Sequence, residues 1–249
     1  MKYALVSIDW NPEQTKLWLK CIEKYSPKAK VILFPEVNRI GCWSCAKLTC
    51  FEDHPGYEDV DYIIYTDTDV LILHELEDVL GMIGDADVGL SLLREFTSCA
   101  SIDRRIKEYV FGGRVVRGGK RKADKNVPGV IKEMRSMHGK DTSDLYNHYS
   151  SGMVILKASF RADFLASWEA WCERMLAYPY FKDRRHFEEV TLSLWLLKDQ
   201  LPVWWIPPKI HDNLLRPGRL KETPWVLHYH NFRRLHENKL WGLAEECMK

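Results

Sequence analysis

The sequence predicts an α/β fold, a single Rossmann-like domain in which a mostly parallel sheet carries helices on both faces. Strand-like apolar runs alternate with stretches of helical period along the chain, which is the pattern of parallel strands joined by crossover helices. The 249 residues are 46% hydrophobic, and no linker divides 1–249 into separate domains. Polar residues also follow several predicted strands, at the edge where such sheets bind ligands.

Local signals predict the first three elements. Residues 3–8 are apolar and indicate a strand. Asn11 is a typical helix N-cap and Pro12 suits the first helical position, so we expect a helix to begin there. Residues 30–34 indicate a second strand, which Pro35 closes.

Residues 61–73 are the most informative stretch. An apolar run rich in Ile and Tyr indicates a buried strand, and it ends on Asp67 and Asp69. A buried carboxylate pair is costly without a positive partner. Two hard oxygen ligands this close suit Mg²⁺ or Mn²⁺ shared with a substrate phosphate. The alternative is a solvated turn, because Asp favours turns.

The later elements continue the alternation. A Gly-led strand precedes a helix that Ser159 is expected to cap, and the last apolar run ends on two histidines. In chain order, we expect a helix at 75–82, strands at 86–92 and 150–157, helices after Ser159 and at 187–197, and strands at 203–206 and 226–230.

Residues 104–140 form a different kind of segment, rich in Gly, Arg and Lys. We interpret it as a basic flexible insertion, since charge runs of this kind are usually solvated. The alternative is a basic loop that closes over phosphates or holds an acidic acceptor.

Charge and cysteine usage exclude several classes. The formal net charge of +1 gives no reason to expect nucleic acid or a membrane surface as partner. No apolar run approaches bilayer length, and the N-terminal run is too short for a signal peptide. Seven cysteines without a signal indicate reduced thiols in a cytoplasmic protein. The spacing of Cys42, Cys45 and Cys50 raises zinc as an alternative to simple thiols.

Five segments in order resemble motifs of nucleotide-sugar glycosyltransferases of the GT-A fold. The closest pattern is family 8, the group of glycogenin and the bacterial galactosyltransferases. The segments are C-A-K-L-T-C-F at 45–51, D-T-D at 67–69, S-S-G-M-V at 150–154, E-E-V-T-L-S at 188–193 and V-L-H-Y-H-N-F-R-R at 226–234.

The resemblance implies a metal site and a donor site. Asp67, Asp69 and His228 would hold Mn²⁺ or Mg²⁺, which acts as Lewis acid on the leaving diphosphate. His230 is the alternative to His228, because strand period places both on one face. The donor-binding set implied by the resemblance is Ser7 and Asp9 for the nucleoside, Lys47 and Thr68 beside the phosphates or sugar, Ser151 and Gly152 for close backbone approach, and Arg234 for the diphosphate.

Glu188 and Glu189 are the candidate catalytic residues, at the position where the family has Asp-Gln. Alternatively, both acids are only favourable charges at a helix N-terminus. The implied reaction moves a sugar from a nucleotide diphosphate sugar, with uridine the expected base, to a glycan hydroxyl with retention of configuration. Three alternatives stay open. They are an inverting enzyme with Glu188 or Glu189 as base, a haloacid dehalogenase-like phosphohydrolase with Asp67 as nucleophile, and a non-catalytic module that binds a nucleotide sugar or glycan.

Overall fold

The computed structural model describes residues 1–37, 39–98, 145–177, 187–199, 201–213 and 222–249. The basic insertion expected at 104–140 lies outside the described residues. Within the described part of the chain, no helix combines the length and apolar character needed to cross a bilayer.

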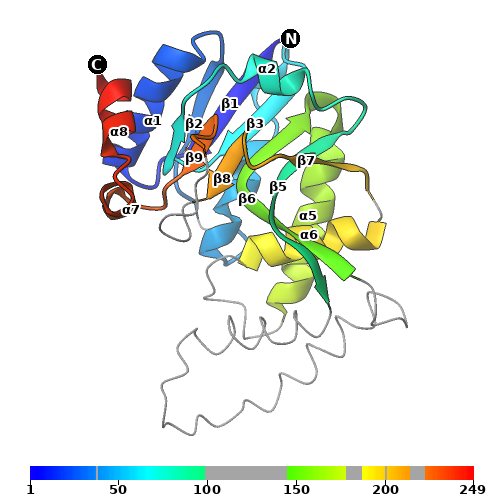
Figure 1. The fold of residues 1–249 in the computed structure, drawn as a ribbon. Coiled ribbons are helices and arrows are strands. Elements are labelled where there is room, and N and C mark those ends of the chain that lie inside the picture. Colours follow the sequence, from blue (N-terminus) through cyan, green and yellow to red (C-terminus); the bar gives the residue numbers. More distant parts are fainter. Residues whose placement is uncertain (38, 99–144, 178–186, 200, 214–221) are drawn as a thin grey trace, which may run out of the picture.

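A six-stranded sheet forms the centre of the fold (Figure 1). Only β6 runs antiparallel to its neighbours, β3 and β5, so the expectation of a mostly parallel sheet is confirmed. Two strands are longer than expected, because β5 and β6 pair with each other beyond the main sheet. In spatial order the strands are β2 (Lys30–Phe34), β1 (Tyr3–Ile8), β3 (Tyr62–Thr66), β6 (Leu145–Lys157), β5 (Val88–Ser98) and β7 (Val203–Ile206).

A second sheet of three short strands was not predicted, although the strand expected to end at Asp67 is present as β3. The chain leaves the main sheet after β3, passes Asp67 and Asp69, and re-enters an extended conformation as β4. β4 pairs antiparallel with β9, and this register places Val70 opposite His228. The small sheet therefore brings the end of β9 to the two aspartates. Its strands are β4 (Val70–Ile72), β9 (Val226–His228) and β8 (His211–Asn213).

The helices begin largely where the sequence predicted. The Asn11 side chain accepts hydrogen bonds from the backbone N–H groups of Glu13 and Gln14, which confirms the N-cap. The predicted cap at Ser159 is wrong, because Ser159 lies in a 3₁₀ turn and Phe160 precedes the helix without a side-chain cap. The helices are α1 (Pro12–Tyr25), α2 (Glu77–Leu80), α5 (Arg161–Leu176), α6 (Phe187–Asp199), α7 (Phe232–Glu237), α8 (Trp241–Met248), and the 3₁₀ helices η1 (Trp43–Phe51), η2 (Pro55–Tyr57) and η3 (Ala158–Phe160).

Hydrophobic cores cover both faces of the main sheet. Along β1, Ala4, Val6 and Ile8 face the core formed with η1, α5 and α6, whereas Tyr3 and Leu5 face the core formed with α1, α8 and the small sheet. This alternation is the period of two of a strand buried on both sides. Figure 1 shows α1 beside α8 and, away from them, α5 with α6. The end of β3 lies between these two layers, and the candidate site is located there.

Candidate active site

Three predicted metal ligands come together where β3 and β9 end. His228 Nε2 lies 2.9 Å from Asp69 Oδ1 and 3.8 Å from Asp67 Oδ2. The β4–β9 pairing produces this contact, and a backbone hydrogen bond from Tyr229 N to Asp69 O (3.0 Å) reinforces it. The carboxylates and the imidazole thus form one cluster, as a divalent-metal site requires.

His230 belongs to the same cluster, although the reason given by the sequence does not hold. β9 ends at His228, so His230 is not a strand residue, and its φ of 63° lies in the left-handed region. Its ring nevertheless stacks on that of His228 at a centroid distance of 4.1 Å. Potential ligand atoms of Asp69, His228 and His230 all lie within 4.8 Å of one another. Both histidines, which were weighed as alternatives, are therefore available.

The half-buried Asp69 and the buried His228 form a pair of opposite charge. Burial disfavours the charged carboxylate, but the adjacent imidazole outweighs burial and lowers the pKa of Asp69 to about 2. Burial likewise opposes the charged imidazole, but Asp69 and then Asp67 raise the pKa of His228. These donors fit a divalent cation, because an ion can replace the proton as the positive partner of the carboxylates.

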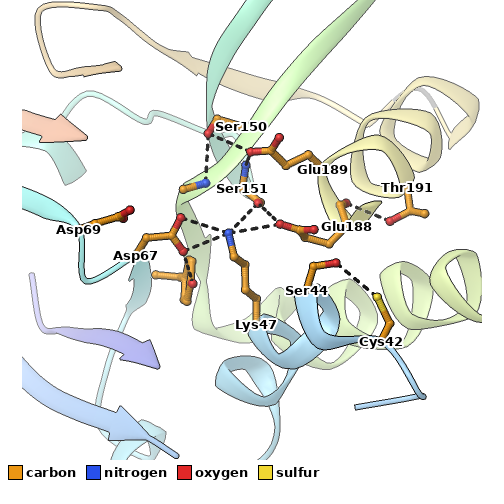
Figure 2. Close-up of polar contacts among 12 residues, drawn as sticks. Cys42, Ser44, Lys47, Asp67, Asp69, Ser150, Ser151, Glu188, Glu189 and Thr191 are labelled. Atoms are coloured by element: carbon orange, nitrogen blue, oxygen red, sulfur yellow. Dashed lines mark hydrogen bonds and ion pairs between the residues drawn. The ribbon is translucent and has the colours of Figure 1, made fainter. Parts of the chain in front are cut away.

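Lys47 lies at the centre of a second cluster beside the first (Figure 2). Its Nζ is 3.0 Å from Asp67 Oδ1, 2.9 Å from Ser151 Oγ and 3.4 Å from Glu188 Oε1. Burial acts to lower the pKa of Lys47, but Asp67 and the two glutamates more than offset it and raise that pKa. With only 8% of its surface exposed, Lys47 is not a solvent-facing lysine.

Glu188 and Glu189 lie in the first turn of α6 and face β6. Ser151 Oγ donates to Glu188 Oε1 (3.1 Å), and Ser151 N donates to Glu189 Oε1 (3.3 Å). Glu188 is 2% exposed. Among the described residues, no group hydrogen-bonds its buried Oε2. Favourable surface charges at a helix N-terminus do not explain such burial, and both acids contact Ser151 in the same cluster as Lys47. A catalytic role for either acid stays a prediction.

Gly152 lets β6 approach the end of β9. A Cβ at this position would lie 2.6 Å from His228 Nδ1, inside any normal contact distance. The backbone carbonyl of Gly152 also accepts a hydrogen bond from Asp67 N (3.0 Å). The His228 ring therefore fills the space beside this glycine, where the resemblance implied a donor sugar. Contact between the glycine backbone and the donor stays a prediction.

The remaining predicted donor residues lie at the end of β1, between β3 and β4, and in α7. Ser7 is buried and donates to Thr66 O (2.6 Å), and the exposed Asp9 accepts from Thr15 Oγ1 (2.6 Å). Thr68 is buried between the two aspartates. Arg234 is half-buried in α7, where Asn231 caps its backbone N–H (3.1 Å). Their roles toward a donor stay predictions.

His211 is a buried histidine that no sequence motif indicates. Its Nδ1 lies 2.5 Å from Ser91 Oγ, and its ring is 6.0 Å from that of His228. Burial, with the two neighbouring histidines, lowers the pKa of His211 to about 3. It is therefore neutral at physiological pH. The pairing of β8 with β9 brings His211 close to His228. Local sequence patterns cannot predict this pairing between distant segments.

We expect His211 to make the protein sensitive to acid. The folded state keeps His211 neutral, whereas the unfolded chain takes up a proton below about pH 6.5. The free energy of unfolding should therefore fall by about 1.4 kcal/mol per pH unit as pH drops from about 6 to about 4. Urea unfolding at several pH values measures this slope. The His211→Gln variant should lack this component, and an unchanged slope in that variant would contradict the assignment.

The cysteine cluster gives no support to the zinc alternative. The six cysteines of the described residues are free and buried. In the described ranges, the one group of three potential ligands close enough for an ion is Asp69, His228 and His230. Cys42 instead lies 3.3 Å from Ser44 Oγ, and hydrogen bonding from Cys45 lowers the pKa of Cys42 to about 6. The sequence favoured free thiols over a zinc site at these cysteines, and the contacts agree with free thiols.

Comparisons with known proteins connect this geometry to a fold. No protein-family model matches the chain, and curated proteins gave no significant match. Among solved structures, it is similar to the galactosyltransferase LgtC in complex with donor and acceptor sugar analogues. The TM-score is 0.52 at 13% identity, over 99% of this chain and 96% of that one.

Two further glycosyltransferases show the same likeness over part of their length. GlyE of Streptococcus pneumoniae matches with a TM-score of 0.55 at 10% identity, over 98% of this chain and 60% of that one. The bifunctional WbbM matches with a TM-score of 0.53 at 9% identity, over 100% and 52%. Such low identities establish architecture only, and the expected fold class is confirmed: the chain has the Rossmann-like GT-A fold.

Proposed function

We propose that this protein is a metal-dependent glycosyltransferase related to family 8. It would move a sugar from a nucleotide diphosphate sugar, with uridine as the expected base, to a glycan hydroxyl. The observation that carries the proposal is the convergence of Asp67, Asp69 and His228 at the strand edge, beside the buried Lys47–Glu188 pair. The similarity to LgtC, described with donor and acceptor sugar analogues, supports it. The free cysteines support a cytoplasmic location.

The Asp69–His228 cluster and the Lys47 cluster would have different roles in the reaction. A bound Mn²⁺ or Mg²⁺ would supply Lewis-acid neutralisation of charge on the diphosphate. Asp69 and His228 orient each other across a 2.9 Å contact and would hold the ion. Lys47 holds Asp67 and Glu188 in fixed positions and keeps positive charge beside the site. Arg234 would bind phosphate oxygens from α7 with its guanidinium fork.

The transfer breaks the bond between the anomeric carbon and the diphosphate and forms one to the acceptor oxygen. The acceptor proton leaves either to the departing phosphate, as in a retaining route, or to a carboxylate base, as in an inverting route. We favour retention because of the family resemblance. Glu188, with one oxygen free of hydrogen bonds from the described residues, would then stabilise positive charge on the sugar ring.

The phosphohydrolase alternative receives less support from the contacts of Asp67. Tyr65 donates to Oδ1 (2.5 Å), and Lys47 lies within 3.2 Å of both carboxylate oxygens. An aspartate held in this way is a poor nucleophile toward phosphorus, since its lone pairs are engaged. Assays of sugar-nucleotide hydrolysis against a generic phosphate ester separate the two functions, and turnover of any donor excludes a purely binding module.

Metal-dependent nucleotide binding is the direct test. Uridine diphosphate and its sugars should raise the melting temperature, and Mn²⁺ should increase the shift because ligand and ion both bind the folded state. Asp69→Ala should remove the metal-dependent part, whereas Asp59→Ala, at an exposed loop position, should not. Nucleotide affinity that is unaffected by EDTA would rule out the metal assignment.

Arg234 is predicted to bind the diphosphate. Arg234→Ala should weaken uridine diphosphate affinity by about 1.5–3 kcal/mol, the scale of a hydrogen bond to a charged group. Uridine itself should bind as before. The neighbouring Arg233, which pairs with Glu237 at the exposed surface, provides the matched control Arg233→Ala. Calorimetry that finds equal losses for nucleoside and diphosphate would indicate a folding defect and contradict the role.

A further inference from the structure

The two aspartates after β3 have different surroundings. Asp67 is engaged on both oxygens by Lys47 and on Oδ1 by Tyr65. In Figure 2 none of the drawn contacts of Lys47 reaches Asp69. Asp69 has His228 as its partner, and its Oδ1 receives no regular hydrogen bond within the described part of the chain. Asp67 is thus occupied as part of a polar network, whereas Asp69 is arranged as a ligand.

The Asp69–His228 contact has the spacing of two ligands on one ion. Their facing atoms are 2.9 Å apart, and Asp69 Oδ1 has no other close polar partner among the described residues. Adjacent ligands of an octahedral ion with bonds of about 2.1 Å lie about 3 Å apart, and opposite ligands about 4 Å. A ring nitrogen of His230 lies within 4.8 Å of the ligand atoms of Asp69 and His228. Small side-chain movements would therefore bring all three ligands onto one ion.

The backbone at His230 is held in a conformation that its residue type disfavours. A φ of 63° is strained for any residue other than glycine and persists only where the surroundings enforce it. Two backbone hydrogen bonds flank it, from Tyr229 N to Asp69 O (3.0 Å) and from Asn231 N to Tyr229 O (2.7 Å). This turn stacks the His230 ring on that of His228. A ring nitrogen of His230 thereby lies close to the Asp69 carboxylate.

We infer that the metal ion is held by Asp69, His228 and His230, two imidazoles and one carboxylate, and that Asp67 is a positioning residue tied to Lys47. This inference rests on the proposed function and changes its ligand set. Imidazole-rich sites suit transition ions, whereas Mg²⁺ prefers carboxylate, carbonyl and water oxygens. The site should therefore select Mn²⁺ and Co²⁺ over Mg²⁺, with Co²⁺ bound more tightly than Mn²⁺. Three protein ligands leave positions for phosphate oxygens.

Calorimetric titration of Co²⁺, Mn²⁺ and Mg²⁺, each with and without uridine diphosphate, tests the ligand set. We expect His230→Gly to weaken Co²⁺ and Mn²⁺ binding by at least about 10–100-fold and to reduce the preference over Mg²⁺. Glycine adopts positive φ without strain, so the variant should fold, and its melting temperature checks this. His236→Ala, at an exposed histidine in α7, is the control. The visible spectrum of bound Co²⁺ should change in His230→Gly and persist in Asp67→Asn.

Different failures separate the inference from the proposed function. If His230→Gly keeps the wild-type Co²⁺ affinity and spectrum while Asp67→Asn loses them, the ligand set is Asp67, Asp69 and His228. The inference then fails and the proposed function stands. If the wild-type protein binds none of the three ions, even with uridine diphosphate present, both the inference and the metal dependence are overturned.

Discussion

Replacing Lys47 with methionine should lower the free energy of unfolding by about 3–5 kcal/mol. The Lys47 ammonium compensates the carboxylates of Asp67 and Glu188 at 3.0 and 3.4 Å. Methionine retains an apolar stem but leaves the half-buried Asp67 and the buried Glu188 without this charge. Denaturant unfolding at neutral pH, with the midpoint and slope fitted together, measures the loss.

Two controls identify the cause of that loss. Lys16→Met, at an exposed position of α1, should change stability by less than about 0.5 kcal/mol. Adding Glu188→Gln to Lys47→Met should recover part of the loss, because one of the two uncompensated charges is removed. A loss below about 1 kcal/mol, or no recovery in the double variant, would show that Lys47 is solvated in solution.

Glu188→Gln should reduce the turnover number by about two to four orders of magnitude while donor affinity remains unchanged. The amide still accepts the hydrogen bond from Ser151 Oγ, but it cannot take a proton or oppose positive charge on the sugar. Glu189→Gln tests the second candidate separately, because Glu189 Oε1 accepts from Ser151 N and an amide oxygen keeps that hydrogen bond. Equal rates for wild type and Glu188→Gln would exclude Glu188 from catalysis.

The configuration of the first product decides how Glu188 acts. Proton NMR of the newly formed glycosidic bond reports its anomeric configuration before any mutarotation of the free sugar. Retention is the expected result, with Glu188 stabilising charge. An inverted product would overturn the retaining assignment and make Glu188 or Glu189 the general base on the acceptor hydroxyl.

Sequence patterns predicted the elements that depend on local chemistry. The N-cap at Asn11 and the strand limits of β1 and β2 follow from neighbouring residues alone. The fold class followed from the alternation of elements, and the approach of His228 to the aspartates was implied by the family resemblance that five motifs carry.

The features that sequence did not reveal depend on pairing between distant segments. The short β4, the burial of Lys47 against Glu188, and His211 beside His228 each need the assembled sheets. The backbone conformation of His230 was missed for another reason. The strand period assumes that β9 continues to His230, but the strand ends at His228 and the backbone of His230 has a positive φ. Residues other than glycine rarely adopt this conformation, so the sequence does not predict it.

The pairing of β4 with β9 also determines when the site forms during folding. Val70 and His228 meet across most of the chain, and contacts so distant carry the full entropy of closing the intervening loop. During synthesis the aspartates emerge long before the histidines that approach them, so the proposed metal site cannot form in a nascent chain until β9 has been made. Metal-dependent nucleotide binding should therefore be gained in the last phase of refolding, later than the helical signal, and it reports completion of the native state.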